Sequence, residues 1–199
     1  MSLLKNKHLW LFITFGIIIL VVSLRRPEEK KDELPVLGEL IDFRLTDQNG
    51  NEFGKQDMYG KVWVADFIFT TCAGPCPVMS GQFTELQSRF ANASDLNLLS
   101  ISVNPDYDTP EILHEYGKRY GANYDKWYFL TGEKEAIHKL AVDGFKIGSI
   151  EDPIFHSTRF ILLDEKARIR GYYISSEFEE MQQLWHDVEL LAEVTPSHH

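Results

Sequence analysis

The sequence predicts one α/β domain with a mixed central sheet, preceded by one N-terminal transmembrane helix. Apolar runs typical of buried strands alternate with segments whose apolar residues recur at helical spacing. An uncharged apolar segment lies close to the N-terminus. The rest of the 199-residue chain shows no internal repeat and no second type of composition, and its length fits one domain.

The N-terminal segment, residues 9–24, contains no charged residue over 16 positions. As a helix it would span roughly 24 Å, slightly less than a hydrocarbon core of about 30 Å, and Lys7 and Arg25 can snorkel to cover the difference. A cleaved signal peptide is an alternative, because Lys5 and Lys7 would form its basic region. However, no small-x-small cleavage site precedes Arg25. We therefore favour an uncleaved anchor over a signal peptide or a buried core helix.

These features predict three regions: a signal-anchor at residues 1–26, a charged tether at 27–35 and a folded domain at 36–195. Basic residues flank the apolar segment on both sides, so the positive-inside rule alone does not orient it. Its position at the start of the chain is typical of signal-anchors. We therefore expect a single-pass membrane protein with its folded domain on the extracytoplasmic, periplasmic side.

The sequence of the first half of the domain predicts a hairpin and then a central strand that leads into a helix. Residues 41–45 alternate apolar and polar, and the Asn-Gly pair at 49–50 favours a hairpin turn. Residues 61–69 form a nearly continuous apolar run, which is typical of a strand covered on both faces. Pro77 suits the first turn of the following helix. The apolar face of that helix consists of Met79, Phe83, Leu86 and Phe90.

The second half continues with alternating elements. Residues 96–103 predict another buried strand, and Thr109 caps a helix whose apolar face is Ile112, Leu113 and Tyr116. A short strand at 127–130, a short helix at 134–142 and a loop at 143–157 follow. Residues 158–164 and 168–174 predict a hairpin. The closing helix, 177–194, directs five apolar side chains inward: Met181, Leu184, Trp185, Val188 and Leu191. This order, with a cysteine pair opening a helix after the central strand, predicts a thioredoxin-like fold.

Only two cysteines are present, Cys72 and Cys76, which excludes a disulfide-stapled miniprotein and a four-cysteine zinc site. If Cys76 lies in the first helical turn, both sulfurs can face one point beyond the end of the strand. A helix N-terminus stabilises thiolate, the form that binds soft metals such as Cu(I) or Zn(II) and attacks disulfides. The pair is therefore the candidate functional site.

Two sulfurs need at least one further metal ligand, and His156 is the best-placed of the seven histidines. It precedes an apolar strand at the point where a thioredoxin-like fold returns beside the cysteine helix. His114, His138 and His186 fall within predicted helices, where we expect ordinary helix-surface or boundary residues.

Asp66 lies six residues before Cys72 in an otherwise apolar strand. A buried carboxylate without a partner is costly. It is either an edge-facing or hydrogen-bonded structural residue, or a proton relay for thiol chemistry at the cysteine pair.

The acidic balance of the chain limits its partners. Lys and Arg number 20 and Asp and Glu 30, which gives a net charge of −10 and a pI near 5.1. Such a surface repels phosphate backbones, so we expect no nucleic-acid partner.

The motifs around these residues resemble the SCO/SenC family. Residues 72–77 (CAGPCP) resemble its C-x-x-x-C-P motif, residues 102–110 (SVNPDYDTP) its second block, and residues 156–158 (HST) its histidine block. The resemblance spans roughly residues 38–173. It implies a membrane-tethered, thioredoxin-like copper protein with ligands at Cys72, Cys76 and His156. Such a protein delivers copper to, or prepares the cysteines of, the binuclear copper centre of cytochrome c oxidase.

This chain departs from the family pattern at Ala73–Gly74, where many members have Pro-Asp, and at Asn104, where members have Asp. The first departure removes an acidic residue that could orient the site or contact a partner. The implied partners are the copper-bearing subunit of the oxidase and either a copper donor or a thiol reductant.

Two alternatives to copper delivery remain. One is a thiol–disulfide oxidoreductase, in which Cys72 attacks, Cys76 resolves and Asp66 manages a proton. The other is a binding domain with a structural disulfide.

Overall fold

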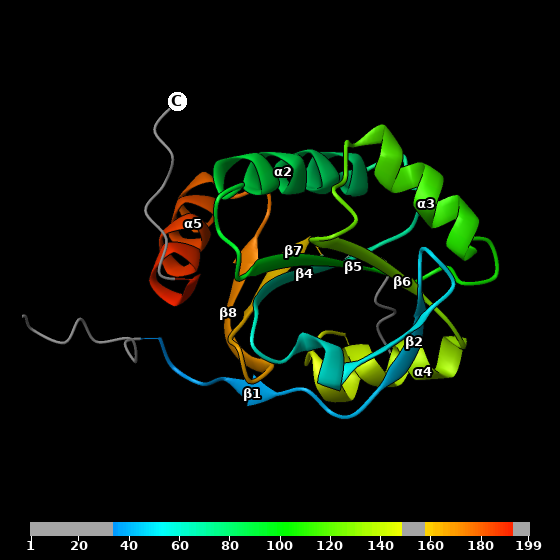
Figure 1. The fold of residues 1–199 in the computed structure, drawn as a ribbon, viewed down its shortest axis with the longest axis horizontal. Helices are drawn as coiled ribbons and strands as arrows, with labels where there is room; N and C mark the ends of the chain where they lie inside the picture. The colour runs from blue at the N-terminus through cyan, green and yellow to red at the C-terminus, as the bar shows by residue number, and fades with distance from the viewer. Residues whose placement is uncertain (1–33, 149–157, 193–199) are drawn as a thin grey trace, which may run out of the picture. The chain divides into compact units, whose positions relative to one another are not determined.

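The computed structural model describes residues 34–148 and 158–192, which form an eight-stranded mixed sheet with helices on both faces (Figure 1). The strand order is β1-β8-β7-β4-β5-β6-β2-β3. The strands are β1 (Gly38–Glu39), β2 (Arg44–Asp47), β3 (Glu52–Gly54), β4 (Val62–Ile68), β5 (Leu96–Ser102), β6 (Trp127–Thr131), β7 (Arg159–Leu163) and β8 (Arg168–Ile174).

The centre of the sheet is the parallel pair β4 and β5, in which every residue is buried. Their register places Asp66 opposite Ser100 and Ile68 opposite Ser102. Both faces of these strands are covered, which explains why their sequences are almost continuously apolar.

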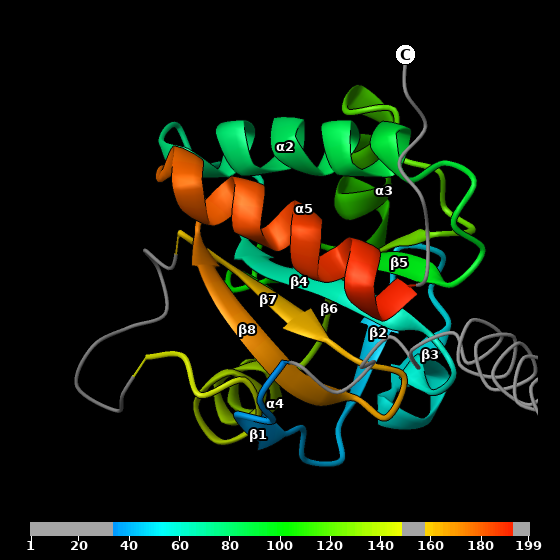
Figure 2. The ribbon, with the colours of Figure 1, turned by 90° about the vertical axis from the view of Figure 1, so that its left-hand side faces the viewer.

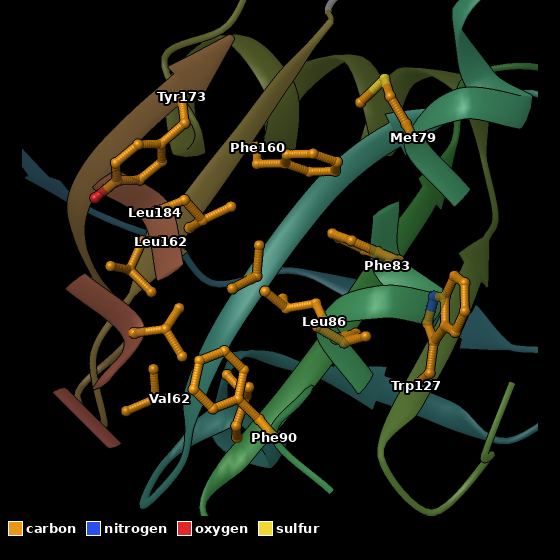
Figure 3. Packing of buried hydrophobic residues seen from close by; sticks show 14 of the residues in the cluster. Val62, Met79, Phe83, Leu86, Phe90, Trp127, Phe160, Leu162, Tyr173 and Leu184 are labelled. Atoms are coloured by element: carbon orange, nitrogen blue, oxygen red, sulfur yellow. The ribbon is translucent and has the colours of Figure 1, made fainter. Parts of the chain in front are cut away.

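One face of the sheet is covered by α2 (Pro75–Arg89), α3 (Pro110–Arg119) and α5 (Phe178–Ala192). Figure 3 shows the core beneath them, where Phe83 of α2 stacks on Phe160 with 4.8 Å between ring centroids and meets Trp127 edge-on. The predicted inward residues of α2 are all buried: Met79, Phe83, Leu86 and Phe90. This packing fixes α2 across the sheet, and therefore fixes its first turn beside the end of β4.

The other face is covered by a 3-10 turn η1 (Lys55–Met58), a short helix α4 (Lys134–Lys139) and a π-helical turn η2 (Leu140–Gly144). A second core lies there, in which Phe67 meets Phe145 edge-on at 5.3 Å.

Strand direction determines which segments meet at the site. Strands β4, β5 and β6 run parallel, β7 is antiparallel to β4, and β8 is antiparallel to β7. Strands β4, β5 and β8 therefore end at one edge of the sheet, and β7 begins there. We call this the site edge. Figure 2 shows the first turns of α2 and α5 at this same end of the molecule.

Three boundaries differ from the sequence predictions. The first predicted strand, 41–45, is displaced to β2, because Thr46 and Asp47 pair with β6. The helix predicted from Pro77 begins at Pro75, whose ring presets the first helical φ angle. The helix predicted at 134–142 ends at Lys139 and continues as the π-helical turn.

Several predictions lie outside the described residues: the anchor at 1–26, the tether up to residue 33, His156 and the last residues of the closing helix. Within residues 34–148 and 158–192, no helix is long and apolar enough to cross a membrane. The described residues all belong to a compact unit that starts at Leu34.

Candidate dithiol site

The two cysteines lie where β4 passes into α2, at the site edge. Phe69 ends the strand region, and its carbonyl accepts a hydrogen bond from the Cys72 backbone N–H at 3.1 Å. Cys76 lies in the first turn of α2, as predicted, and is 4% exposed, whereas Cys72 is half-buried. Both are free thiols. The site therefore presents one accessible sulfur and one that is covered by the core.

The start of α2 makes the two thiols electrostatically unequal. Burial opposes ionisation of Cys72, but hydrogen bonds from the backbone N–H and the thiol of Cys76, and from the Gly74 backbone N–H, outweigh it and lower the pKa of Cys72. This is the stabilisation that a helix N-terminus gives to an anion. Burial raises the pKa of Cys76, and the Cys72 and Asp66 charges add to that increase. Cys72 is thus the more acidic thiol of the pair.

Asp66 lies in the core beneath α2, fully buried on the same face of β4 as Val64 and Ile68. Neither of its carboxylate oxygens has a hydrogen-bond partner among the described residues. Burial raises the pKa of Asp66 to about 7, and a weak interaction with the opposite Ser100 hydroxyl, outside hydrogen-bond geometry, lowers it slightly. Asp66 is therefore not edge-facing: it lies in the core, where the interaction with Ser100 does not offset the burial of its carboxylate.

The polar groups around Asp66 are engaged with one another. Ser100 accepts a hydrogen bond from the Trp127 indole N–H at 3.0 Å. Ser80, one turn after Cys76, is hydrogen-bonded to the Tyr116 hydroxyl at 2.8 Å. The Ser100 hydroxyl keeps its own proton and faces Asp66, but the Asp66 oxygens make no hydrogen bond of normal geometry among the described residues, which is a costly arrangement for a buried carboxylate.

Asp108 is a further site residue that the sequence predictions did not single out. It is fully buried and accepts hydrogen bonds from the Thr70 backbone N–H at 3.1 Å, from the Thr70 hydroxyl, and from the Ser102 hydroxyl at 2.5 Å. It therefore joins the end of β4, two residues before Cys72, to the end of β5. Two sequence signals point to it: its place in the block at residues 102–110 and its position directly before the Thr109 helix cap.

The third predicted ligand, His156, lies outside the described residues. The described start of β7, at Arg159, lies at the site edge beside the end of β4. His138 and His186 are exposed on their helices, and His114 stacks on Tyr124 at 4.5 Å. Among residues 34–148 and 158–192, no group of three His, Cys, Asp or Glu side chains could hold a metal ion.

We expect Asp66 to make stability depend on pH. Its pKa is about 7 in the folded chain and 3.8 as a free carboxyl, so the folded state keeps a proton that the unfolded state releases. This stability is fully present below pH 4 and is lost as pH rises through 7. The unfolding free energy of the wild type relative to Asp66→Asn should fall by about 4 kcal/mol between pH 4 and pH 8.

Urea unfolding across this pH range measures the difference. Asp106→Asn, at an exposed carboxylate, is the matched control and should show no such trend. A difference between wild type and Asp66→Asn that does not vary with pH would contradict the raised pKa.

Comparison with known proteins agrees with this fold. The model of the family described as SCO1/SenC matches residues 35–193. The SCO1 protein homolog of Bacillus subtilis (strain 168) is 31% identical over 182 residues, which cover 88% of this chain and 93% of that protein.

Two solved structures share the architecture. BsSco, described as a member of the Sco family of cytochrome c oxidase assembly proteins with a disulfide switch, is 29% identical. The match covers 81% of this chain and 98% of the BsSco chain, with a TM-score of 0.70. ScoI of Bradyrhizobium japonicum, solved with copper bound, is 23% identical. The match covers 74% of this chain and 98% of ScoI, with a TM-score of 0.61, which shows the shared fold. The predicted α/β, thioredoxin-like class is confirmed, and the chain belongs to the SCO1/SenC family.

Proposed function

We propose that this chain binds copper through Cys72, Cys76 and His156. In this proposal it delivers the metal to, or prepares the cysteines of, the binuclear copper centre of cytochrome c oxidase. The observation that carries the proposal is the pair of free thiols at the start of α2, one half-exposed and one buried. A copper-bound relative and a relative described as an oxidase assembly protein support the choice of metal and partner.

The chemistry of the two sulfurs suits copper as a cargo. Thiolate is a soft ligand that favours Cu(I), and the lowered pKa of Cys72 makes this sulfur the first to bind. His156 would complete a set of three ligands. A site with so few ligands releases its metal when a partner offers better ones. The half-exposed position of Cys72 leaves this sulfur accessible to such a partner.

We also propose that residues 1–26 anchor the chain in a membrane and that residues 27–35 tether a folded domain, 36–195, on the extracytoplasmic side. The support is the uncharged run at residues 9–24 and the charged stretch after it. The partners in this location are the copper-bearing subunit of the oxidase and a copper donor or thiol reductant.

Copper titration tests the three-ligand site. The full chain, reduced and anaerobic in detergent, should hold one Cu(I) against a competing chelator. Losing even an outer-shell partner costs about 10–100-fold in metal affinity, so His156→Ala should weaken binding by at least about tenfold. His138→Ala, at an exposed helix histidine, is the matched control. Equal binding by wild type and His156→Ala would rule out the Cys2His site.

A second candidate function, thiol–disulfide oxidoreductase, is favoured by Asp66. The Cys72 thiolate would attack a substrate disulfide, forming a mixed disulfide and releasing one substrate thiolate. Cys76 would then lose its proton to the Asp66 carboxylate and attack the Cys72 sulfur. The second substrate thiolate leaves, the substrate is reduced, and the cysteine pair is oxidised. The fully buried, unpartnered carboxylate supports the role of proton acceptor.

We expect Asp66→Asn to slow the reduction of 2-hydroxyethyl disulfide by the full chain by at least about tenfold at pH 7, because it removes a general base. The rate should also lose its dependence on pH near 7, the pKa of Asp66. The rate is measured as the amount of thiol released at successive times after mixing. Glu85→Gln, at an exposed carboxylate on α2, is the control. An unchanged rate and pH profile would remove the proton-relay role.

Cell fractionation tests the anchor. The full-length chain should remain with the membrane fraction after a salt wash, because an apolar helix is held by the bilayer interior rather than by charge. A charge-bearing double variant, Ile17→Lys with Ile18→Lys, should shift the chain out of this fraction. A shortened chain in the soluble fraction of wild-type cells would instead indicate a cleaved signal.

A further inference from the structure

We propose that the site edge is a docking surface for a protein whose thiols are surrounded by basic and apolar residues. This inference deepens the proposed function, because it names the partner surface that thiol or copper exchange at Cys72 would require. It rests on three features of the described residues: exposed apolar side chains, the distribution of charge, and continuity with the accessible thiol.

Strand β6 also ends at the site edge and leads to α4 on the other face, whereas the three segments that lead to α2, α3 and α5 each expose a large apolar side chain. Val78 in the first turns of α2 is 61% exposed, Tyr107 after β5 is 52% exposed, and Phe178 at the start of α5 is 75% exposed. A hydrogen bond of 2.8 Å from Gln82, one turn after Val78, to the Ser175 carbonyl ties α2 to the segment that carries Phe178. These side chains are therefore held on one surface.

The other exposed large apolar residues of the described chain lie away from this edge. Val36 and Leu37 precede β1, which pairs with the start of β8, and Tyr59 precedes the start of β4. Leu190 lies 12 residues after Phe178, which is about 18 Å further along α5. The apolar side chains at the site edge are thus separate from the other exposed apolar residues and share this edge with Cys72.

The same surface is acidic. Within the described chain, no Lys or Arg occurs at residues 70–88, 102–117 or 171–192, which include the three segments. Exposed carboxylates stand beside the apolar side chains, at Asp106 next to Tyr107 and at Glu177 and Glu179 on either side of Phe178. Arg159 starts β7 at this edge, but strand alternation places it on the opposite face of the sheet from α2, since its neighbour Phe160 packs beneath α2.

An apolar surface with carboxylates around it suits a protein partner with lysine or arginine around apolar contacts. It would repel the anionic headgroups of a membrane. Tyr107 adjoins the buried Asp108, which is bonded to Thr70 two residues before Cys72, so Tyr107 is held next to the segment that carries the reactive thiol. In this proposal, a partner that reaches Cys72 with its own thiol contacts this surface.

Thiol exchange with designed peptides tests the proposal without copper. The probes are short peptides closed by one disulfide and flanked by Lys and Phe, by Glu and Phe, or by Lys and Ser. Cys72 attacks the peptide disulfide, and Cys76 then displaces the peptide, which leaves as a dithiol while the cysteine pair is oxidised. The reduced full chain is used, and the rate constant for each peptide is compared with that for neutral 2-hydroxyethyl disulfide.

The Lys/Phe peptide should react about tenfold faster than the Glu/Phe peptide at low ionic strength, and the difference should shrink in high salt. Phe178→Ser should slow the Lys/Phe peptide about fivefold, because an exposed aromatic contact is lost, and should leave 2-hydroxyethyl disulfide unaffected. Leu190→Ser, on the same helix but away from the edge, is the matched control and should change neither rate.

Equal effects of Phe178→Ser and Leu190→Ser, equal rates for the three peptides, or no reaction with any peptide would each overturn the proposal. If the copper proposal is wrong, wild type and His156→Ala bind Cu(I) equally in the titration, and the peptide preferences are unchanged. Failure of the docking surface likewise leaves the copper titration unchanged, so the two proposals are separable.

Discussion

The Asp108 carboxylate joins the ends of the two central strands, and the placement of the cysteine pair depends on this junction. It accepts hydrogen bonds from Thr70 after β4 and from Ser102 at the end of β5. Hydrogen bonds to a charged acceptor contribute about 1.5–3 kcal/mol each, more than neutral ones. They hold the short connection from Thr70 to Pro75 against the sheet edge, while Phe83 and its neighbours fix the body of α2. With both ends held, Cys72 lies over the N-terminus of the helix.

The core around this junction combines strong packing with one unfavourable group. Val64 and Ile68 are fully buried, and between them Asp66 lacks any partner among the described residues. An apolar side chain that fits the same space would remove this cost, because replacing a buried polar group by an apolar one of the same shape is often neutral or stabilising. The nearest polar group is the Ser100 hydroxyl, whose interaction lowers the pKa of Asp66 but does not offset its burial. This cost supports the proposed role of Asp66 in proton transfer.

Strand periodicity and helical spacing allowed most of the fold to be predicted, because burial on one or two faces leaves a direct pattern in the sequence. The inward residues of α2 and the run of β4 are examples. The displaced β2 could not be predicted, because its limits depend on pairing with β6, which is more than 80 residues away. For the site, the position of Cys76 in the first turn followed from the adjacent prolines. The role of Asp108 did not, because its partners Thr70 and Ser102 meet it only through the parallel register of β4 and β5.

The chain has only two cysteines, so copper binding and thiol exchange must use the same sulfurs and exclude each other at any moment. A pair that is oxidised has no thiolate to offer a metal, and a pair that holds copper has no free nucleophile. The state of the site is therefore set by which partner arrives. Because Cys72 is half-exposed and Cys76 is covered, partners reach the pair at Cys72, and in the proposed docking mode they contact Val78, Tyr107 and Phe178. The apolar and acidic character of that surface would then select among partners before any chemistry at sulfur begins.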